Sequence, residues 1–129
     1  MTGKPPPNVP VVITKEKEAY QCWIPIHRDF PRTERFGLGI RIENAFLDML
    51  ELSFAAVYLP LEPKILALGK TISKLDTLKF FMQLAWESRL IPTLKYTMLS
   101  EKLEEIGRML GGWRKGLLEK LPPQQGGRK

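Results

Sequence analysis

Prolines divide the middle of the chain into four segments, and this spacing constrains the fold more than any other feature. Pro31, the pair Pro60 and Pro63, and Pro92 stand at nearly regular intervals, and each segment between them is long enough for several helical turns. Strand-like patterning is confined to residues 9–13. A length of 129 residues fits one domain. We therefore expect an all-α protein, an up-down-up-down four-helix bundle with short connections.

The two ends of the chain differ from its middle in composition. Residues 1–13 are rich in proline and lack helical periodicity, so we expect an extended or disordered arm. The helical bundle is expected over residues 14–121, with Thr14 as the N-cap of its first helix. Pro25 lies inside that helix and is expected to kink it. Residues 122–129 are expected to form a flexible basic tail.

The segment over residues 32–59 carries apolar side chains on two opposite sides of one expected helix. One stripe is broken only by a glutamate: Phe36, Ile40, Leu47, Leu50, Phe54 and Val57. The other repeats without a break: Leu38, Ile42, Ala45, Met49, Leu52, Ala56 and Leu59. A helix at the edge of a monomeric bundle needs only one apolar face. We therefore expect self-association, with the second stripe at the interface between subunits through Leu38, Ile42, Met49 and Leu52.

The last two segments show a simpler pattern, with one main apolar face each. The third helix is expected over residues 64–88, and the fourth begins at Pro92, a residue favoured in the first helical turn. The apolar stripe of the fourth helix consists of Leu99, Leu103, Ile106, Leu110, Trp113 and Leu117. Both patterns are typical of helices that surround a single core.

The chain lacks the side-chain combinations that catalysis or metal binding would need. His27 is the only histidine and Cys22 the only cysteine, and a helix would place the two on different sides. We interpret His27, near the end of the first helix, as a surface or dipole-satisfying residue. Glu43 interrupts an apolar stripe, and we interpret it as part of a buried salt bridge with an arginine rather than as a general base. The sequence therefore predicts no enzyme, no metal and no cofactor.

The charge of the chain favours a polyanionic partner. Its 20 Lys and Arg residues outnumber 14 Asp and Glu, for a net charge of +6. Such a partner is either nucleic acid or an anionic membrane, and a purely solubilising role for the charge is the alternative. The cations gather in the C-terminal part and at the junction of the first two helices: Arg108, Arg114, Lys115, Lys120, Arg128 and Lys129; and Arg28, Arg32, Arg35 and Arg41. An up-down bundle places these groups at opposite ends, where some would also satisfy helix dipoles.

No apolar segment is long enough to span a bilayer and no secretory signal is visible, so we expect a soluble, cytoplasmic protein without a membrane partner.

Two stretches of the chain resemble known families. Residues 30–39 read FPRTERFGLG and are similar to the start of the second helix in bacterial four-helix-bundle proteins, including the ribosomal RNA intervening-sequence proteins. Residues 105–113 read EIGRMLGGW and resemble a signature of the accessory variability determinant (Avd) proteins of diversity-generating retroelements. Glycine inside a helix costs about 1 kcal/mol per residue, which makes this second motif specific. Alternatively, Gly107, Gly111 and Gly112 let helices approach closely or end the helix.

The resemblance implies both an assembly and a function. Avd proteins are basic homopentameric barrels of four-helix protomers, which bind the reverse transcriptase and the template RNA of the element. They support adenine-mutagenic complementary-DNA synthesis for retrohoming, in elements that bacteria, archaea and phages carry. The candidate contacts to RNA or polymerase are Arg32, Arg35, Arg41, Arg108, Arg114, Lys115 and Lys120. The alternative is a structural or interaction protein of the wider bundle family, with no role in a retroelement.

Overall fold

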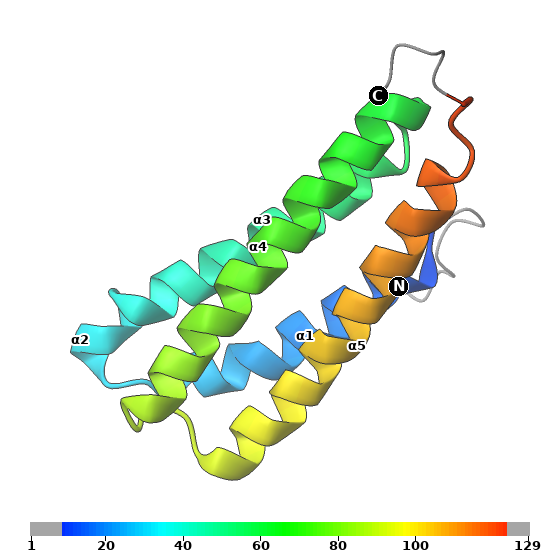
Figure 1. The fold of residues 1–129 in the computed structure, drawn as a ribbon. Helices are drawn as coiled ribbons and strands as arrows, with labels where there is room; N and C mark the ends of the chain where they lie inside the picture. Colours follow the sequence, from blue (N-terminus) through cyan, green and yellow to red (C-terminus); the bar gives the residue numbers. More distant parts are fainter. Residues whose placement is uncertain (1–8, 124–129) are drawn as a thin grey trace, which may run out of the picture.

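The computed structural model describes residues 9–123, and these residues form helices joined by short links, with no strand among them. Figure 1 shows four long helices and one short helix. In chain order they are α1 (Val11–Arg28), α2 (Arg32–Arg35), α3 (Leu38–Ala56), α4 (Leu61–Glu87) and α5 (Thr93–Leu118). The all-α bundle that the proline spacing predicted is confirmed.

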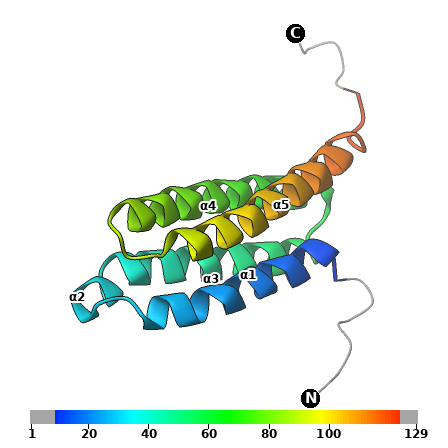
Figure 2. The same cartoon turned by 90° about the horizontal axis from the view of Figure 1, so that it is seen from below.

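The long helices surround one core and alternate in direction (Figures 1 and 2). Around the bundle they follow the order α1, α3, α4 and α5, and α5 packs back against α1. One end of the bundle contains residues 28–38 and 88–92, which we call the α2 end. The other contains the start of α1, the link at residues 57–60 and the last turns of α5, which we call the C-terminal end. Links that are far apart in the sequence therefore lie at the same end of the bundle.

Buried apolar side chains from every long helix form the core. The stripe predicted for the last helix is buried at Leu99, Leu103, Ile106, Leu110 and Leu117. The largest buried side chains of the other helices include Trp23, Phe46, Leu68 and Met82. Burial of each such side chain contributes about 1.5–3 kcal/mol to folding, so the helix faces that meet the core fix the arrangement.

Helix α1 begins earlier than expected, so the prediction of an N-cap at Thr14 and of a non-helical arm up to residue 13 was wrong. Pro10 precedes the first helical residue, and Thr14 is exposed one turn inside the helix. The reason is that Val12 and Ile13 are buried against the core, which stabilises the added turn. The helix continues past Pro25, whose side chain is exposed, to Arg28. The rest of the expected arm and tail, residues 1–8 and 124–129, lies outside the described part of the chain.

The single helix expected over residues 32–59 is instead broken into α2 and α3. Phe36 and Gly37 separate the two, and Gly37 has backbone angles φ −104° and ψ −102°, which are not helical. The break lets the start of α3 approach α1 closely. A Cβ atom on Gly39 would lie 2.6 Å from the Nε2 atom of His27, so no larger residue fits there without a shift.

Candidate nucleic-acid interface

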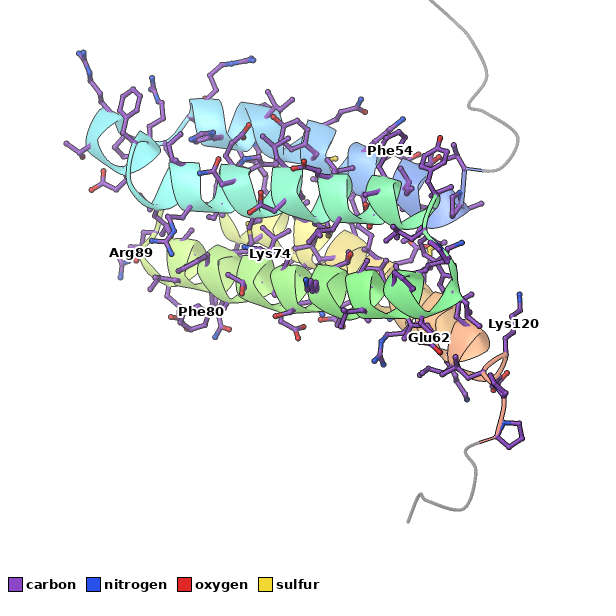
Figure 3. The ribbon with its side chains drawn as sticks, turned by 90° about the horizontal axis from the view of Figure 1, so that it is seen from above. Phe54, Glu62, Lys74, Phe80, Arg89 and Lys120 are labelled. Carbon is purple, nitrogen blue, oxygen red and sulfur yellow. The ribbon has the colours of Figure 1, made fainter. Side chains whose placement is uncertain are left out.

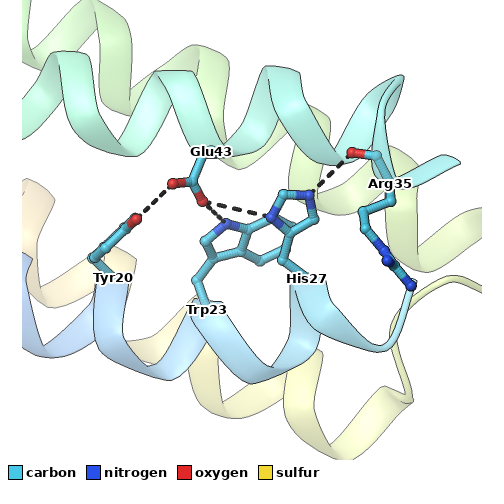
Figure 4. Close-up of polar contacts among 5 residues, drawn as sticks. All are labelled: Tyr20, Trp23, His27, Arg35 and Glu43. Carbon is cyan, nitrogen blue, oxygen red and sulfur yellow. Dashed lines mark hydrogen bonds and ion pairs between the residues drawn. The ribbon is translucent and has the colours of Figure 1, made fainter. Parts of the chain in front are cut away.

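A polar cluster beneath the α2 end joins α1 to α3 through the carboxylate of Glu43 (Figure 4). The hydroxyl of Tyr20 donates to its Oε2 atom at 2.5 Å, and Nε1 of Trp23 donates to its Oε1 atom at 3.0 Å. The hydrogen bond to Glu43 and burial raise the pKa of Tyr20 to about 12. The predicted arginine partner of Glu43 was wrong, because two aromatic donors and His27 from α1 surround the carboxylate instead.

His27 holds the corner formed by α2 in place. Its Nδ1 atom lies 3.6 Å from Oε1 of Glu43, and its Nε2 atom lies 3.1 Å from the carbonyl oxygen of Arg35 (Figure 4). The imidazole stacks on Trp23 with 5.0 Å between ring centroids. Its interpretation as a surface residue was wrong, since the side chain is only 15% exposed and both ring nitrogens face acceptors. The α2 corner is therefore tied to α1 and α3 at once.

The arginines predicted for this end have different environments. Nη2 of Arg35 donates to the carbonyl oxygen of Phe30 at 3.2 Å. The guanidinium of Arg41 lies over the ring of Phe81 on α4, 5.1 Å from its centroid, a geometry typical of a cation–π contact. Arg32 is exposed and makes no side-chain hydrogen bond or ion pair with another described residue. Arg32 is thus the most available of the three for phosphate.

Two hollows flank the last turn of α1 at the α2 end. A groove of about 390 Å³ between α1 and α3 is lined by Ile24, Arg28, Arg35 and Ile40, among others. A second hollow of about 670 Å³ is lined by Asp29, Arg89, Lys95 and the link between α4 and α5. The sequence reasoning missed Arg89 and Lys95, because it considered only the first helix junction. The topology could have indicated them, since an up-down bundle places the link between its third and fourth helices beside the link between its first and second.

Arg89, two residues after the end of α4, has an unusual backbone conformation. Its φ of 65° lies in the left-handed region, which non-glycine residues adopt rarely. Figure 3 shows Arg89 and Lys120 at opposite ends of the molecule. The side chain of Arg89 is exposed, so the α2 end presents another cation besides those that the sequence pointed out.

The C-terminal end also carries cations, but Arg114 has a structural role. Its Nε atom donates to the carbonyl oxygen of Ile65 on α4 at 3.4 Å, and the side chain is half-buried. Arg108, Lys115 and Lys120 are exposed. Lys115 and Lys120 are thus exposed cations at this end, Arg108 lies nearer the middle of α5, and Arg114 contributes to interhelical packing.

The glycines of residues 105–113 do not share one explanation. A Cβ atom on Gly107 would lie 3.3 Å from Cδ2 of Leu75, so this glycine does let α5 approach α4 closely. Gly111 and Gly112 have nothing within 4 Å of an added Cβ, and α5 continues beyond them to Leu118. They therefore neither permit a close contact within the protomer nor end the helix.

The two apolar stripes around α3 have the opposite orientation from the one expected. Ile42 and Met49 are fully buried inside the protomer, and Leu38 and Leu52 are half-buried, so the predicted interface stripe faces the core. The physical reason is size, because this side also carries the small residues Gly39, Ala45, Ser53 and Ala56, which let neighbouring helices approach. The exposed stripe is the other one.

Exposed apolar side chains remain on two neighbouring helices. On α3 they are Leu47, Phe54 and Tyr58 just beyond its end, which we call the α3 face. On α4 they are Leu66, Phe80 and Leu84, which we call the α4 face. Figure 3 shows Phe54 and Phe80 on different sides of the helix pair. These two faces are separate from each other, and α5 exposes Leu94 and Met98 as well.

A buried carboxyl group lies deep between α1 and α3. Glu16 is fully buried, and its Oε2 atom accepts a hydrogen bond of 2.7 Å from the hydroxyl of Ser53. Its Oε1 atom has no hydrogen-bond partner among the described residues. Burial raises the pKa of Glu16 to about 8, so the side chain is largely protonated at neutral pH. Sequence patterning did not indicate this buried group, since the charged residues next to Glu16 suggest an exposed position.

Within residues 9–123, no helix is long and apolar enough to cross a bilayer. In the same range, no group of three or more His, Cys, Asp or Glu side chains is placed to hold a metal ion.

Comparison with curated proteins finds no match for the chain. A family model described as bAvd-like matches residues 11–117, which run from the first turn of α1 into the last turn of α5. The match covers the whole bundle and agrees with the resemblance to Avd proteins that residues 105–113 carry. The chain belongs to the bAvd-like family.

Proposed function

We propose that this protein is a non-enzymatic accessory protein of a diversity-generating retroelement, which binds the reverse transcriptase and the template RNA of the element. In this role it supports mutagenic complementary-DNA synthesis and retrohoming. The observation that carries the proposal is the bAvd-like match over residues 11–117, because it spans all four long helices rather than one motif.

The distribution of cations supports RNA binding. Exposed arginines and lysines lie at both ends of the bundle, among them Arg32 and Arg89 at the α2 end and Lys115 and Lys120 at the C-terminal end. The described salt bridges involve none of these four residues. Cations without a carboxylate partner are suited to phosphate contact, and such binding weakens steeply with salt because counterions are released.

The two apolar faces support a homo-oligomer, and we propose a closed ring of five subunits. The α3 face and the α4 face lie on different helices of the protomer. If the α3 face of one subunit packs on the α4 face of the next, the contact is heterologous, and heterologous contacts form a ring when the rotation between subunits closes. Light scattering coupled to gel filtration tests this assembly, and a monomer at micromolar concentration would contradict it.

Contact with the polymerase needs a basis other than net charge. A reverse transcriptase has a basic nucleic-acid channel, so the positive charge of this chain does not attract it. We propose that folded template RNA bridges the two basic surfaces, and that the proteins also touch directly through complementary shape.

Reconstitution with the cognate polymerase and template RNA tests the proposed function. The measured quantities are the yield, length and adenine errors of complementary DNA primed on that RNA. We expect all three to depend on this protein, and surface-arginine variants to lose activity while still forming the oligomer. If omission of the protein changes none of the three, the accessory role is wrong. A reverse-transcriptase gene and paired template and variable repeats beside this gene would separate this role from that of a bundle protein outside any retroelement.

A further inference from the structure

The α2 corner contains one large side chain that the protomer itself does not use. Most of residues 30–39 have an internal role: Phe30 is buried against Trp23, Arg35 binds a backbone carbonyl, and Gly39 admits His27. Phe36 is 69% exposed and has no aromatic partner among the described residues.

The surroundings of Phe36 distinguish it from the other strongly exposed phenylalanines. The ring of Phe54 packs edge-on against Tyr58 at 5.4 Å, and the ring of Phe80 lies 5.6 Å from that of Phe81. Phe36 instead directly follows Arg35, one helical turn after Arg32. An isolated exposed hydrophobic residue is ordinary, but an unpaired aromatic ring next to arginines is the combination that unpaired nucleotides favour.

We infer that Phe36 stacks on an unpaired base of bound RNA, while Arg32 and Arg28 contact the flanking phosphates. The inference rests on the proposed RNA binding and names the form of RNA that the α2 end accepts. Every base has a flat face, so stacking tolerates any sequence. An A-form duplex keeps its base faces covered, so the ring selects loops, bulges and single strands.

Hydrogen bonds hold the backbone on both sides of Phe36. The carbonyl of Arg35, next to Phe36 in the chain, lies 3.1 Å from Nε2 of His27, and the amide of Gly37 donates to the carbonyl of Glu34 at 3.2 Å. The corner is therefore arranged before RNA arrives, which lowers the ordering cost of binding.

The groove between α1 and α3 continues the surface from this corner, because Arg35 is one of its lining residues. It adds Arg28 for phosphate contact and Ile24 and Ile40 as apolar walls. The carboxylate of Glu43, another lining residue, already accepts two hydrogen bonds and faces His27, so both of its oxygens are engaged within the protein.

The test compares Phe36→Ala with Leu94→Ala, which removes an exposed apolar side chain on α5, outside the α3 face and the α4 face. Fluorescence anisotropy measures binding to a short oligouridine and to a blunt RNA duplex of the same length. We expect Phe36→Ala to weaken oligouridine binding about tenfold, the effect of losing one stacked base, and to leave duplex binding unchanged. Leu94→Ala should change neither, and Phe36→Trp should restore single-strand binding because it restores the ring.

A second readout separates stacking from charge. Arg32→Gln should reduce the slope of log affinity against log salt by about one, whereas Phe36→Ala should leave that slope unchanged. If Phe36→Ala binds the oligouridine and the duplex as tightly as the unmodified protein does, the inference is overturned. A change in oligomeric mass in Phe36→Ala would also overturn it, because Phe36 would then be a subunit contact. If the unmodified protein bound neither RNA at low salt, the proposed RNA-binding function itself would fail.

Discussion

The hydroxyl of Ser53, near the end of α3, donates to the buried carboxyl group of Glu16, near the start of α1, over 2.7 Å. The pair joins two helices that are far apart in the sequence. It does so with an acid whose pKa burial raises to about 8. In the unfolded chain the same group has its ordinary pKa of 4.5. The folded state therefore binds this proton more tightly than the unfolded state does.

The first prediction is a pH dependence of stability that Glu16 causes. Its contribution is greatest below about pH 4.5 and is lost as the pH rises to about 8, because ionisation of the buried acid is disfavoured. The slope is at most about 1.4 kcal/mol per pH unit in this window. In Glu16→Gln the free energy of unfolding, measured with denaturant, should fall less over the same range. Parallel pH profiles for the two proteins would contradict this.

The second prediction concerns the side of α3 that faces the core. Met49→Glu places a carboxylate at a position that is 0% exposed, so it should destabilise the protomer by about 3 kcal/mol or more. Circular dichroism during denaturation measures the loss. A variant that kept its midpoint but lost oligomeric mass would mean that this side is a subunit interface after all.

The third prediction concerns the α3 face. Phe54→Glu alters a side chain that is 54% exposed, so the helical content of the protomer should stay the same. The charge would be buried without a partner in the proposed contact, so the oligomer should dissociate. Light scattering gives the mass, and Leu94→Glu is the matched control, because Leu94 is exposed on α5, outside both apolar faces. If Phe54→Glu keeps its full mass, the α3 face is not the contact.

The fourth prediction compares two glycine positions. Gly39→Ala should destabilise the protein, because its Cβ would lie 2.6 Å from Nε2 of His27. Gly111→Ala should stabilise it by up to about 1 kcal/mol, since an added Cβ meets open space inside a helix. Thermal unfolding of both variants gives the two signs. Destabilisation by Gly111→Ala would show that this glycine has a role in packing, for example against a neighbouring subunit.

The fifth prediction separates binding from packing at the C-terminal end. Charge reversal at Lys115 and Lys120 should weaken RNA binding and its salt dependence while the unfolding midpoint stays constant, because both side chains are exposed. Arg114→Glu should also lower the midpoint, because it removes the hydrogen bond to the carbonyl of Ile65. Equal midpoints for the two variants would argue against the structural role of Arg114.

Much of the fold could be predicted from the sequence, because proline spacing and helical periodicity are local signals. The burial of Leu103 and Ile106 on α5 follows from such spacing alone. Which side of α3 faces the core could not be obtained in this way, since both stripes repeat at helical spacing. The small residues on one side, Ala45 and Ala56 among them, indicate the side that faces the core. Helical periodicity alone takes no account of side-chain size.

The contacts of the candidate site were harder to predict, because they join residues from different helices. Glu43 meets Tyr20 and Trp23, which precede it by 23 and 20 residues, and no local pattern specifies that meeting. The cations at the ends of the bundle were partly predictable from topology. Their individual environments were not, as the contact of Arg114 with α4 illustrates.

The helices form a closed cycle in space, although the chain covers only three of its four connections. Helix α5 packs against α1, and Lys15 lies 3.9 Å from Glu105 across that boundary. The start of α1 and the end of α5 both lie at the C-terminal end. A circular permutant with a new linker there and new termini next to Pro60 should keep the same helix packing, because Pro60 is exposed. The place where this chain starts is thus one of several that the architecture permits.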